Sequence, residues 1–165
     1  MDANKYLLQP TGHALVLGAS GGIGSEIARS LAANGVKKLT LSYGRGRERA
    51  EALASELGAL GAATHLIQVS ERTDETEAVF RARLDEAVTA LGEEVNIYVD
   101  SIGISPNTPL NEQTLKTRVE ANGERIPGWN EVFAVNVAGA FISARVVLNR
   151  MAEKATHGSL VLITS

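Results

Sequence analysis

Three glycines near the N-terminus have a spacing that suits a phosphate-binding turn. The segment Leu17-Gly-Ala-Ser-Gly-Gly-Ile-Gly24 places them at Gly18, Gly22 and Gly24, between an apolar run and a helical pattern. A diphosphate must approach the backbone closely, which a Cβ would block, while unpaired N–H groups at a helix start favour negative charge. Gly24 would also let the helix pack close to the strand. An isolated triad fits a tight turn equally well, but the strand–turn–helix context that the motif requires is present.

The elements around this turn alternate between strand-like and helical patterns. Short apolar runs predict strands at 14–17, 39–43, 65–69, 95–99 and 160–163, and apolar residues at helical spacing predict helices over 23–31, 50–60, 79–91 and 129–151. Thr73 is the expected N-cap of the third helix, followed by acidic residues in its first turn. The expected apolar side of the long fourth helix consists of Trp129, Val132, Phe133, Val137, Ala140, Phe141, Ala144 and Leu148.

Strands that are apolar on both faces are typical of a parallel sheet covered by helices. The predicted fold class is therefore α/β, a Rossmann-like doubly wound parallel sheet that stops after the fifth strand. We expect residues 1–165 to form a single nucleotide-binding domain, with 1–12 as an N-terminal extension. The segment 105–128 is rich in Pro, Asn and Gly, with a short helix expected at 114–119. It is either a loop that covers the substrate or a plain surface insertion.

Composition narrows the class of protein. Hydrophobic residues make up 44% and charged residues 21%, and the net charge is −3 without a block of like charge. This argues against a nucleic-acid or anionic-membrane surface. No apolar run approaches the ~20 residues that span a membrane, and the N-terminus does not read as a signal peptide, so the expected location is cytoplasmic. There is no cysteine and the three histidines lie far apart in sequence, so no metal site is expected.

Further motifs follow the glycine turn in a recognisable order. Asp100-Ser-Ile-Gly103 ends the fourth expected strand, Asn136 lies within Phe133-Ala-Val-Asn-Val-Ala-Gly139, and Gly158-Ser-Leu-Val-Leu-Ile-Thr-Ser165 forms the fifth strand. Trp129 precedes the asparagine on the same helix. With the glycine turn, these motifs make the chain from His13 onward resemble the short-chain dehydrogenase/reductase family.

The resemblance implies an NAD(P)-dependent oxidoreductase, expected to reduce a ketone or 3-oxoacyl substrate. In that family hydride moves between the nicotinamide and a carbonyl or alcohol carbon, with acid–base help from side chains. It implies catalytic roles for Ser165, which would polarise the substrate oxygen, and Asn136, which would hold a water in the proton relay. The residues that the resemblance assigns to the cofactor are Gly18, Ser20, Gly21, Gly22, Ile23, Gly24, Tyr43, Arg45, Gln68, Val69, Ser101, Ile102 and Gly103.

The end of the second strand favours NADP over NAD. An acidic residue there would hold the ribose hydroxyls of NAD, but the sequence has Ser42-Tyr43 followed by Gly-Arg-Gly-Arg-Glu-Arg49. Guanidinium groups suit a 2′-phosphate, although these arginines also fit a solvated helix start. One signal for NADP is missing, because Gly21 stands where many NADP-using members of the family have Arg or Lys.

Other departures concern the cofactor and the chemistry. Gln68-Val69 replaces the usual Asp-Val beside the adenine, and Asp100-Ser101 replaces two asparagines, so that an ionised Asp100 would need partners or a raised pKa. The family's Tyr-x-x-x-Lys pair is absent from the 165 residues. This chain by itself is therefore expected to be inactive, as part of a longer enzyme that forms a homo-oligomer and acts on a small carbonyl or alcohol substrate.

Three alternatives remain open at this point. A non-catalytic nucleotide-binding module would explain the missing Tyr and Lys, but would have no chemical need for Asn136 and Ser165. A methyltransferase is disfavoured by the glycine spacing and by the absent acid after the second strand. An enoyl-thioester reductase is a close relative, because Ser101-Ile-Gly103 resembles that branch, whereas Asn136 favours carbonyl reduction.

Overall fold

The strands of the protein form a parallel sheet in which the chain first adds strands on one side of β1 and then on the other side. The computed structural model describes residues 12–69 and 76–163, and in these ranges five strands pair in the order β3-β2-β1-β4-β7. Their bounds are β1 His13–Leu17, β2 Lys38–Tyr43, β3 Ala63–Gln68, β4 Val95–Asp100 and β7 Ser159–Leu162. From β1 the chain moves outward to β2 and β3, then returns to place β4 and β7 on the other side. Doubly wound sheets bind ligands at the point where the strand order reverses in this way, beyond the carboxyl ends of the strands.

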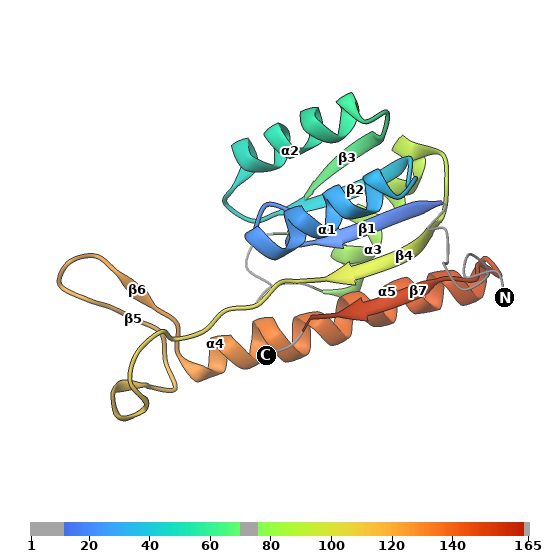
Figure 1. Cartoon of the computed structure of the whole chain (residues 1–165). Helices are drawn as coiled ribbons and strands as arrows, with labels where there is room; N and C mark the ends of the chain where they lie inside the picture. Colours follow the sequence, from blue (N-terminus) through green and yellow to red (C-terminus); the bar gives the residue numbers. More distant parts are fainter. Residues whose placement is uncertain (1–11, 70–75, 164–165) are drawn as a thin grey trace, which may run out of the picture.

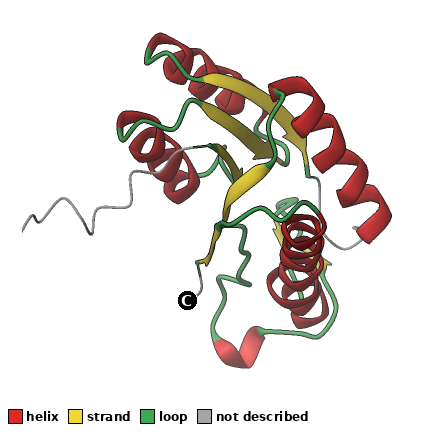
Figure 2. Cartoon of the chain, turned by 90° about the vertical axis from the view of Figure 1, so that its right-hand side faces the viewer, coloured by secondary structure: helices red, strands yellow, loops and turns green. Residues whose placement is uncertain are grey.

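Helices cover both faces of this sheet (Figures 1 and 2). On one face α1 Gly22–Ala33 and α2 Arg47–Ala59 enclose a core with Ala14 and Val16. On the other, α3 Glu77–Leu91 and α5 Ala140–Glu153 pack against Leu15 and Leu17. Successive strand residues face opposite sides, so a strand covered on both faces must be apolar throughout. The predicted α/β fold is confirmed, and each expected strand is present within two residues of its expected bounds.

The third helix begins later than the sequence suggested. Thr73 lies outside the described residues, and the N-cap of α3 is Thr76, whose Oγ1 accepts a hydrogen bond from the Val79 N–H at 3.3 Å. The prediction of Thr73 as the N-cap is therefore wrong. Two threonines three residues apart both precede acidic residues, so cap preference alone could not separate them.

The segment 105–128 has a different local structure from the one expected. The described residues contain a short 3₁₀ helix, η3 Leu110–Glu112, and an antiparallel hairpin of β5 Arg118–Val119 and β6 Arg125–Ile126. The hairpin extends beyond the carboxyl edge of the sheet (Figure 1). The helix expected at 114–119 is wrong. The turn contains Asn122-Gly123, with Gly123 at φ +82°, and this dipeptide is a strong hairpin signal.

The predicted long helix over 129–151 is present but contains a wider turn. It consists of α4 Trp129–Phe133, the π-helical segment η4 Ala134–Gly139, and α5. Its buried side differs from the one expected. Val132 and Ala144 are buried, but the exposed members of the expected set are Phe133, Val137, Phe141 and Leu148. The π-helical segment changes the phase of the helix, and the buried face of α5 instead carries Val146, Val147 and Met151.

By length and composition, the helix Trp129–Glu153 could cross a membrane, contrary to the expectation from apolar runs. Core helices of water-soluble proteins pass the same test, and 39% of the most apolar window is buried inside this fold. The side of α5 that packs on α3 and β4 forms part of the core. The helix is therefore weak evidence for a membrane span.

His13 predicts how stability depends on pH. Its ring is buried, with Nδ1 donating to the Glu93 carbonyl at 2.8 Å and Nε2 accepting from the Thr40 hydroxyl at 2.7 Å. Burial lowers the pKa of His13 below its ordinary value of 6.5, against the opposing effect of the Glu93 carbonyl. As the pH falls below 6.5, the unfolded chain takes up the proton first, so folding free energy is lost until the depressed pKa of the folded state is reached.

We therefore expect the free energy of unfolding to fall as the pH drops below about 7, and the fall to be shallower in His13→Gln, whose side chain does not titrate. Urea unfolding at a series of pH values measures this slope. Because Thr40→Val leaves the titrating ring in place, it should keep a pH dependence near that of the unaltered protein. Equal slopes in the unaltered protein and His13→Gln would contradict the assignment.

Candidate cofactor-binding and catalytic site

The glycine turn between β1 and α1 is shaped by two close approaches of backbone. Gly18 has a φ of +78°, and a Cβ on Gly24 would lie 2.3 Å from the Gly18 carbonyl oxygen. The first turn of α1 can therefore lie against the end of β1 only with glycine at position 24. A Cβ on Gly22 would meet no atom within 4 Å, so this position faces open space. The turn leaves the start of α1 accessible to a ligand, as a bound diphosphate requires.

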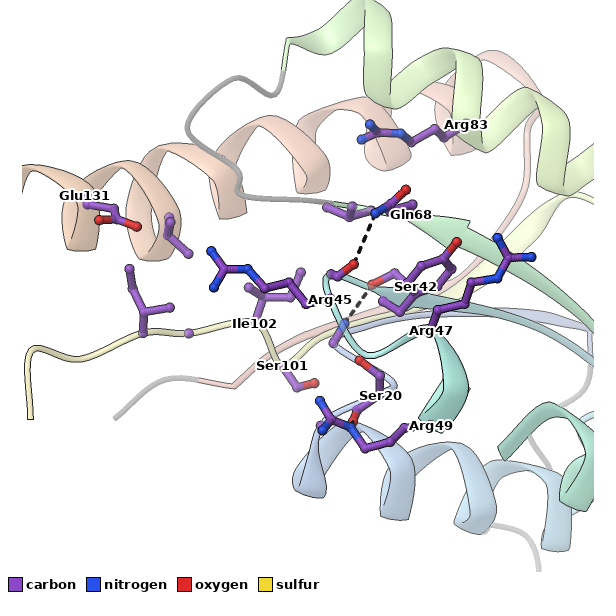
Figure 3. A pocket seen from close by; sticks show the side chains of 18 of the residues that line it. Ser20, Ser42, Arg45, Arg47, Arg49, Gln68, Arg83, Ser101, Ile102 and Glu131 are labelled. Carbon is purple, nitrogen blue, oxygen red and sulfur yellow. Dashed lines mark hydrogen bonds between the residues drawn. The ribbon is translucent and has the colours of Figure 1, made fainter. Parts of the chain in front are cut away.

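A large cavity opens at this turn. It has a volume of about 900 Å³ and lies at the carboxyl ends of β1, β2, β3 and β4. Such a volume is at the upper end of the range for small-molecule sites. Its lining combines the glycine turn, the segment after β2, the end of β3, and Ser101 to Ile104 after β4 (Figure 3). The cavity therefore occupies the reversal point of the sheet, as the fold predicts.

Ser42 at the end of β2 fixes the glycine turn in place. Its buried hydroxyl oxygen accepts from the Gly18 N–H at 2.9 Å, and its carbonyl lies 3.4 Å from the Ser20 nitrogen. Across the cavity edge, the Gln68 amide donates to the Gly44 carbonyl at 3.3 Å. Val69 is buried beside it, with its N–H bonded to the Tyr43 carbonyl. The ends of β2 and β3 thus form one continuous wall.

The cavity has a strongly basic lining. Five arginines contribute to it, from the segment after β2, from the first turn of α2, from α3 and from β6, with Glu131 of α4 as the acidic group opposite. They are Arg45, Arg47, Arg49, Arg83 and Arg125. Arg45 extends into the cavity, whereas Arg47 turns away (Figure 3) and pairs with Glu51 at 2.8 Å. Arg49 donates to the Ser20 carbonyl at 3.1 Å. Among these three neighbours, Arg45 is the one best placed to meet a ligand.

Asp100, at the end of β4, is buried and has hydrogen-bond partners. Its Oδ1 accepts from the Ile102 N–H at 3.0 Å, and its Oδ2 lies 3.2 Å from the Tyr98 hydroxyl. Asp100 is absent from the cavity lining, so its carboxyl group is directed to the interior of the fold. Ser101 binds the Leu17 carbonyl through its hydroxyl at 2.7 Å, which joins the ends of β1 and β4. The partners that an ionised Asp100 requires are therefore present.

Asn136 lies in the π-helical segment and is fully engaged with the backbone after β4. Its Oδ1 accepts from the Ile104 N–H, and its Nδ2 donates to the Ile104 carbonyl, both at 2.9 Å. The two bonds hold Gly103 and Ile104 along the cavity wall. π-helical turns within α-helices occur frequently at functional sites. Ser165, the second expected catalytic residue, lies outside the described residues.

Comparison with known proteins identifies the family. The short chain dehydrogenase family model matches residues 12–165. The chain belongs to the short-chain dehydrogenase family. It is 29% identical to a 3-oxoacyl-[acyl-carrier-protein] reductase of Synechocystis sp., over 92% of this chain and 55% of the relative. It is 30% identical to the D-threitol dehydrogenase of Mycolicibacterium smegmatis, over 92% of this chain and 52% of that protein.

A solved structure of a member of the short-chain dehydrogenase family is also similar to this chain over part of its length. The chain is 27% identical to a short chain dehydrogenase from Burkholderia cenocepacia J2315 in complex with NADP. The match has a TM-score of 0.69 and covers 90% of this chain and 53% of that structure. The chain thus spans about half the length of the proteins it matches.

Most of the expected cofactor residues of this chain do meet in one place. The expected residues that line the cavity are Gly18, Ser20, Gly21, Tyr43, Arg45, Gln68, Val69, Ser101, Ile102 and Gly103. Gly22, Ile23 and Gly24 are not part of the lining, although they form the adjoining start of α1. Asn136 adjoins the cavity through Ile104.

Sequence reasoning missed lining residues that come from distant segments. Val79 and Arg83 lie one turn apart on α3, and Arg125 lies on the hairpin. No local motif marks these positions, and only the packing of α3 and the hairpin brings them to the cavity. Ser42 could have been found, because a small polar residue that ends a strand beside the glycine turn is a natural backbone partner.

The segment 105–128 is anchored to the start of the long helix. The Trp129 and Asn130 N–H groups donate to the Thr114 and Leu115 carbonyls at 2.9 and 3.0 Å. The Trp129 indole donates to the Gln113 side chain at 2.8 Å. These bonds satisfy N–H groups that a helix start leaves without partners inside the helix. The segment therefore has a fixed path next to the cavity.

Glu131 joins the hairpin to α4 at the edge of the cavity. Its carboxylate accepts from Arg125 Nη2 at 2.8 Å and from the Thr117 hydroxyl. Burial acts to raise the pKa of Glu131, but the hydrogen bonds from Thr117 and Arg125 and the charges of Arg125 and Arg45 outweigh it, so the pKa lies below its ordinary value. The carboxylate therefore remains ionised at neutral pH and carries a negative charge opposite Arg45.

Gly128 should be sensitive to any side chain. A Cβ there would lie 2.3 Å from the Lys116 carbonyl carbon and 2.6 Å from the Leu115 carbonyl oxygen, both backbone atoms. Gly128→Ala must push the 114–116 backbone away from α4, and we expect it to lower the free energy of unfolding by about 1–3 kcal/mol. Chemical denaturation measures this change. Gly123→Ala, at a turn with nothing within 4 Å, is the control, and its cost should come from the positive φ alone.

Proposed function

We propose that the complete protein is an NADPH-dependent reductase of a ketone or 3-oxoacyl substrate. The observation that carries the proposal is the single cavity that joins the glycine turn to the Gly103–Ile104 wall held by Asn136. The similarity to a 3-oxoacyl reductase and to a dehydrogenase in complex with NADP supports it. The similarity to a D-threitol dehydrogenase keeps a polyol or other alcohol within the substrate class.

The residues present fit a dinucleotide. The open position beside Gly22 leaves space for a diphosphate at the start of α1, where N–H groups and the helix dipole favour negative charge. Gln68 and Val69, with Val79 of α3, would line the adenine side, and Arg45 would contact a 2′-phosphate. When bound, the nicotinamide supplies the hydride.

The residues of this chain would then position the ring and the proton path. Gly103 and Ile104 would form the wall against the nicotinamide, held by the two Asn136 bonds. Because the Asn136 amide is engaged with Ile104, we place the relay water on its backbone carbonyl, within the π-helical segment. Ser165 would hold the substrate oxygen. A tyrosine and a lysine from outside the 165 residues would complete proton transfer.

The remaining expectations stand as proposals. We propose that residues 1–165 form a single domain with an N-terminal extension at 1–12. We also propose that 105–128 is a substrate-side insertion, which the position of this segment beside the cavity supports. Assembly as a homo-oligomer is supported by the exposed apolar side chains of Phe133, Val137 and Phe141, which leave one side of the long helix uncovered. The cytoplasmic location stays a prediction. Within residues 12–69 and 76–163 no acidic or histidine cluster suited to a metal is found.

A direct test combines mass, binding and turnover. The intact mass of the natural gene product is measured first, and the product is titrated with NADPH and NADH by fluorescence, then assayed with a ketone and a 3-oxoacyl thioester. A product clearly longer than 165 residues that binds NADPH more tightly and reduces a carbonyl would support the proposal. A product of this length that binds NADPH without turnover would instead support the non-catalytic module.

A further inference from the structure

Three buried polar side chains form a connected group behind the Gly103–Ile104 wall of the cavity. Tyr98 and Asp100 lie on β4, and Ser143 lies on α5, each with no more than 3% of its surface exposed. The Tyr98 hydroxyl lies 2.8 Å from Ser143 Oγ and 3.2 Å from Asp100 Oδ2. Buried polar groups are costly unless they are bonded, so a group that crosses from sheet to helix constrains both elements.

This group is bonded to the backbone at both of its ends. Asp100 Oδ1 accepts from the Ile102 N–H at 3.0 Å, which fixes the chain as it leaves β4. Ser143 Oγ donates toward the Gly139 carbonyl at 2.8 Å, with the Ala140 carbonyl at 3.2 Å. Gly139 is the last residue of the π-helical segment, and Ala140 is the first of α5. Ser143 therefore acts at the junction where the wide turn ends.

The position of that junction decides where Asn136 points. In an α-helix a shift of one residue rotates side chains by about 100°, because a turn holds 3.6 residues. A serine that bonds the carbonyl four residues earlier is known to bend helices. Asn136 can reach both backbone groups of Ile104 only if the helix and the Ile102–Ile104 segment keep one relative register. The buried group bonds to this same helix and this same segment.

We propose that Tyr98, Asp100 and Ser143 are positioning residues that hold the π-helical segment and thereby the Asn136–Ile104 contact. The contact between Tyr98 and Ser143 connects the sheet to the helix in the buried interior. The contact between Asn136 and Ile104 connects the same helix to the segment after β4 at the cavity wall. Loss of either hydroxyl should loosen the wall without touching the cofactor turn at Gly18 to Gly24.

The exchange rate of the Ile104 amide tests this directly, because that N–H is donated to Asn136. In the complete protein, hydrogen–deuterium exchange of a peptide spanning Ile104 is compared across variants. Asn136→Ala should raise the rate by about tenfold, the effect of one lost hydrogen bond. Tyr98→Phe and Ser143→Ala should raise it roughly three- to tenfold. Tyr98→Phe combined with Asn136→Ala should exchange no faster than Asn136→Ala alone.

Two further variants separate positioning from general destabilisation. Thr40→Val also removes one fully buried hydroxyl, the one bonded to His13, and should leave Ile104 exchange unchanged. Asp100→Asn should behave like the unaltered protein. Its amide oxygen can still accept from Ile102, and its N–H group can donate to Tyr98, whose own proton then reaches Ser143. Unchanged exchange in both Tyr98→Phe and Ser143→Ala, or an equal rise in Thr40→Val, would overturn the proposal.

Kinetics adds a second readout, which rests on the proposed function. If the protein reduces a carbonyl, Ser143→Ala should lower kcat about three- to tenfold, while KM for NADPH stays within about twofold of its original value. An exchange effect in a protein without reductase activity would leave the positioning role intact and contradict only the reductase assignment. A rise in KM for NADPH with kcat unchanged would contradict positioning through Asn136.

Discussion

Gly24→Ala is expected to lower the free energy of unfolding by about 1–3 kcal/mol, because the added methyl group overpacks a site without space. Its Cβ would lie 2.3 Å from the Gly18 carbonyl oxygen and 2.7 Å from the Gly18 carbonyl carbon, both of which are backbone atoms. The first turn of α1 must therefore move away from β1. This movement displaces the N–H groups that would bind the diphosphate, so NADPH affinity should fall together with stability. Urea unfolding and fluorescence titration measure the two effects.

Gly22→Ala is the matched control for this prediction. Its Cβ meets no protein atom within 4 Å, so stability should change by less than about 1 kcal/mol. If the diphosphate lies where we place it, the methyl group would intrude on it, and NADPH should bind at least about tenfold more weakly. A Gly22→Ala protein that is stable and binds NADPH normally would show that the diphosphate lies elsewhere.

Arg45→Gln is expected to weaken NADPH binding by roughly 10- to 100-fold, the value of a charge-assisted hydrogen bond to phosphate. NADH lacks the 2′-phosphate, so its affinity should change little, and the preference for NADPH should shrink or disappear. The physical basis is that Arg45 reaches into the cavity (Figure 3), with no carboxylate at the end of β2 to bind ribose hydroxyls instead. Parallel titrations with both nucleotides give the ratio.

Arg29→Gln provides the control for lost positive charge. Arg29 pairs with Glu26 and Glu56 and is not part of the cavity lining. Its loss should leave both affinities unchanged. A second variant tests the converse, since Tyr43→Asp places a carboxylate at the end of β2 and should favour NADH. If Arg45→Gln weakens NADH and NADPH equally, Arg45 contributes only general attraction and the NADP assignment loses its main support.

The two glycine positions show how different constraints look alike in sequence. Gly22 and Gly24 belong to one motif, yet the structure gives Gly24 a packing role against backbone and leaves Gly22 facing open space. Sequence spacing predicts the motif but cannot separate these roles, because each depends on how closely β1, α1 and the Ser101 region approach one another. The notion that Gly24 allows close packing agrees with the geometry.

Much of the protein could be predicted from local patterns. Strands apolar on both faces, such as 14–17 and 39–43, require helices on each side, and the glycine turn marks the reversal of the sheet. Tyr98 lies within the strand expected at 95–99, and its side chain is fully buried. These features can be predicted from the sequence because a strand buried on both faces requires apolar residues, and a turn without space for a Cβ requires glycine.

Tertiary structure alone decided the rest. The wide turn around Asn136 and the contributions of Arg83 and Arg125 to the cavity depend on contacts between segments far apart in the chain. The structure also shows the partners of the Asp100 carboxylate, the Tyr98 hydroxyl and the Ile102 N–H. The local sequence pattern determines which residues can be buried and which can form turns. Only the packing of α3, the hairpin and the long helix against the sheet determines which of those residues meet.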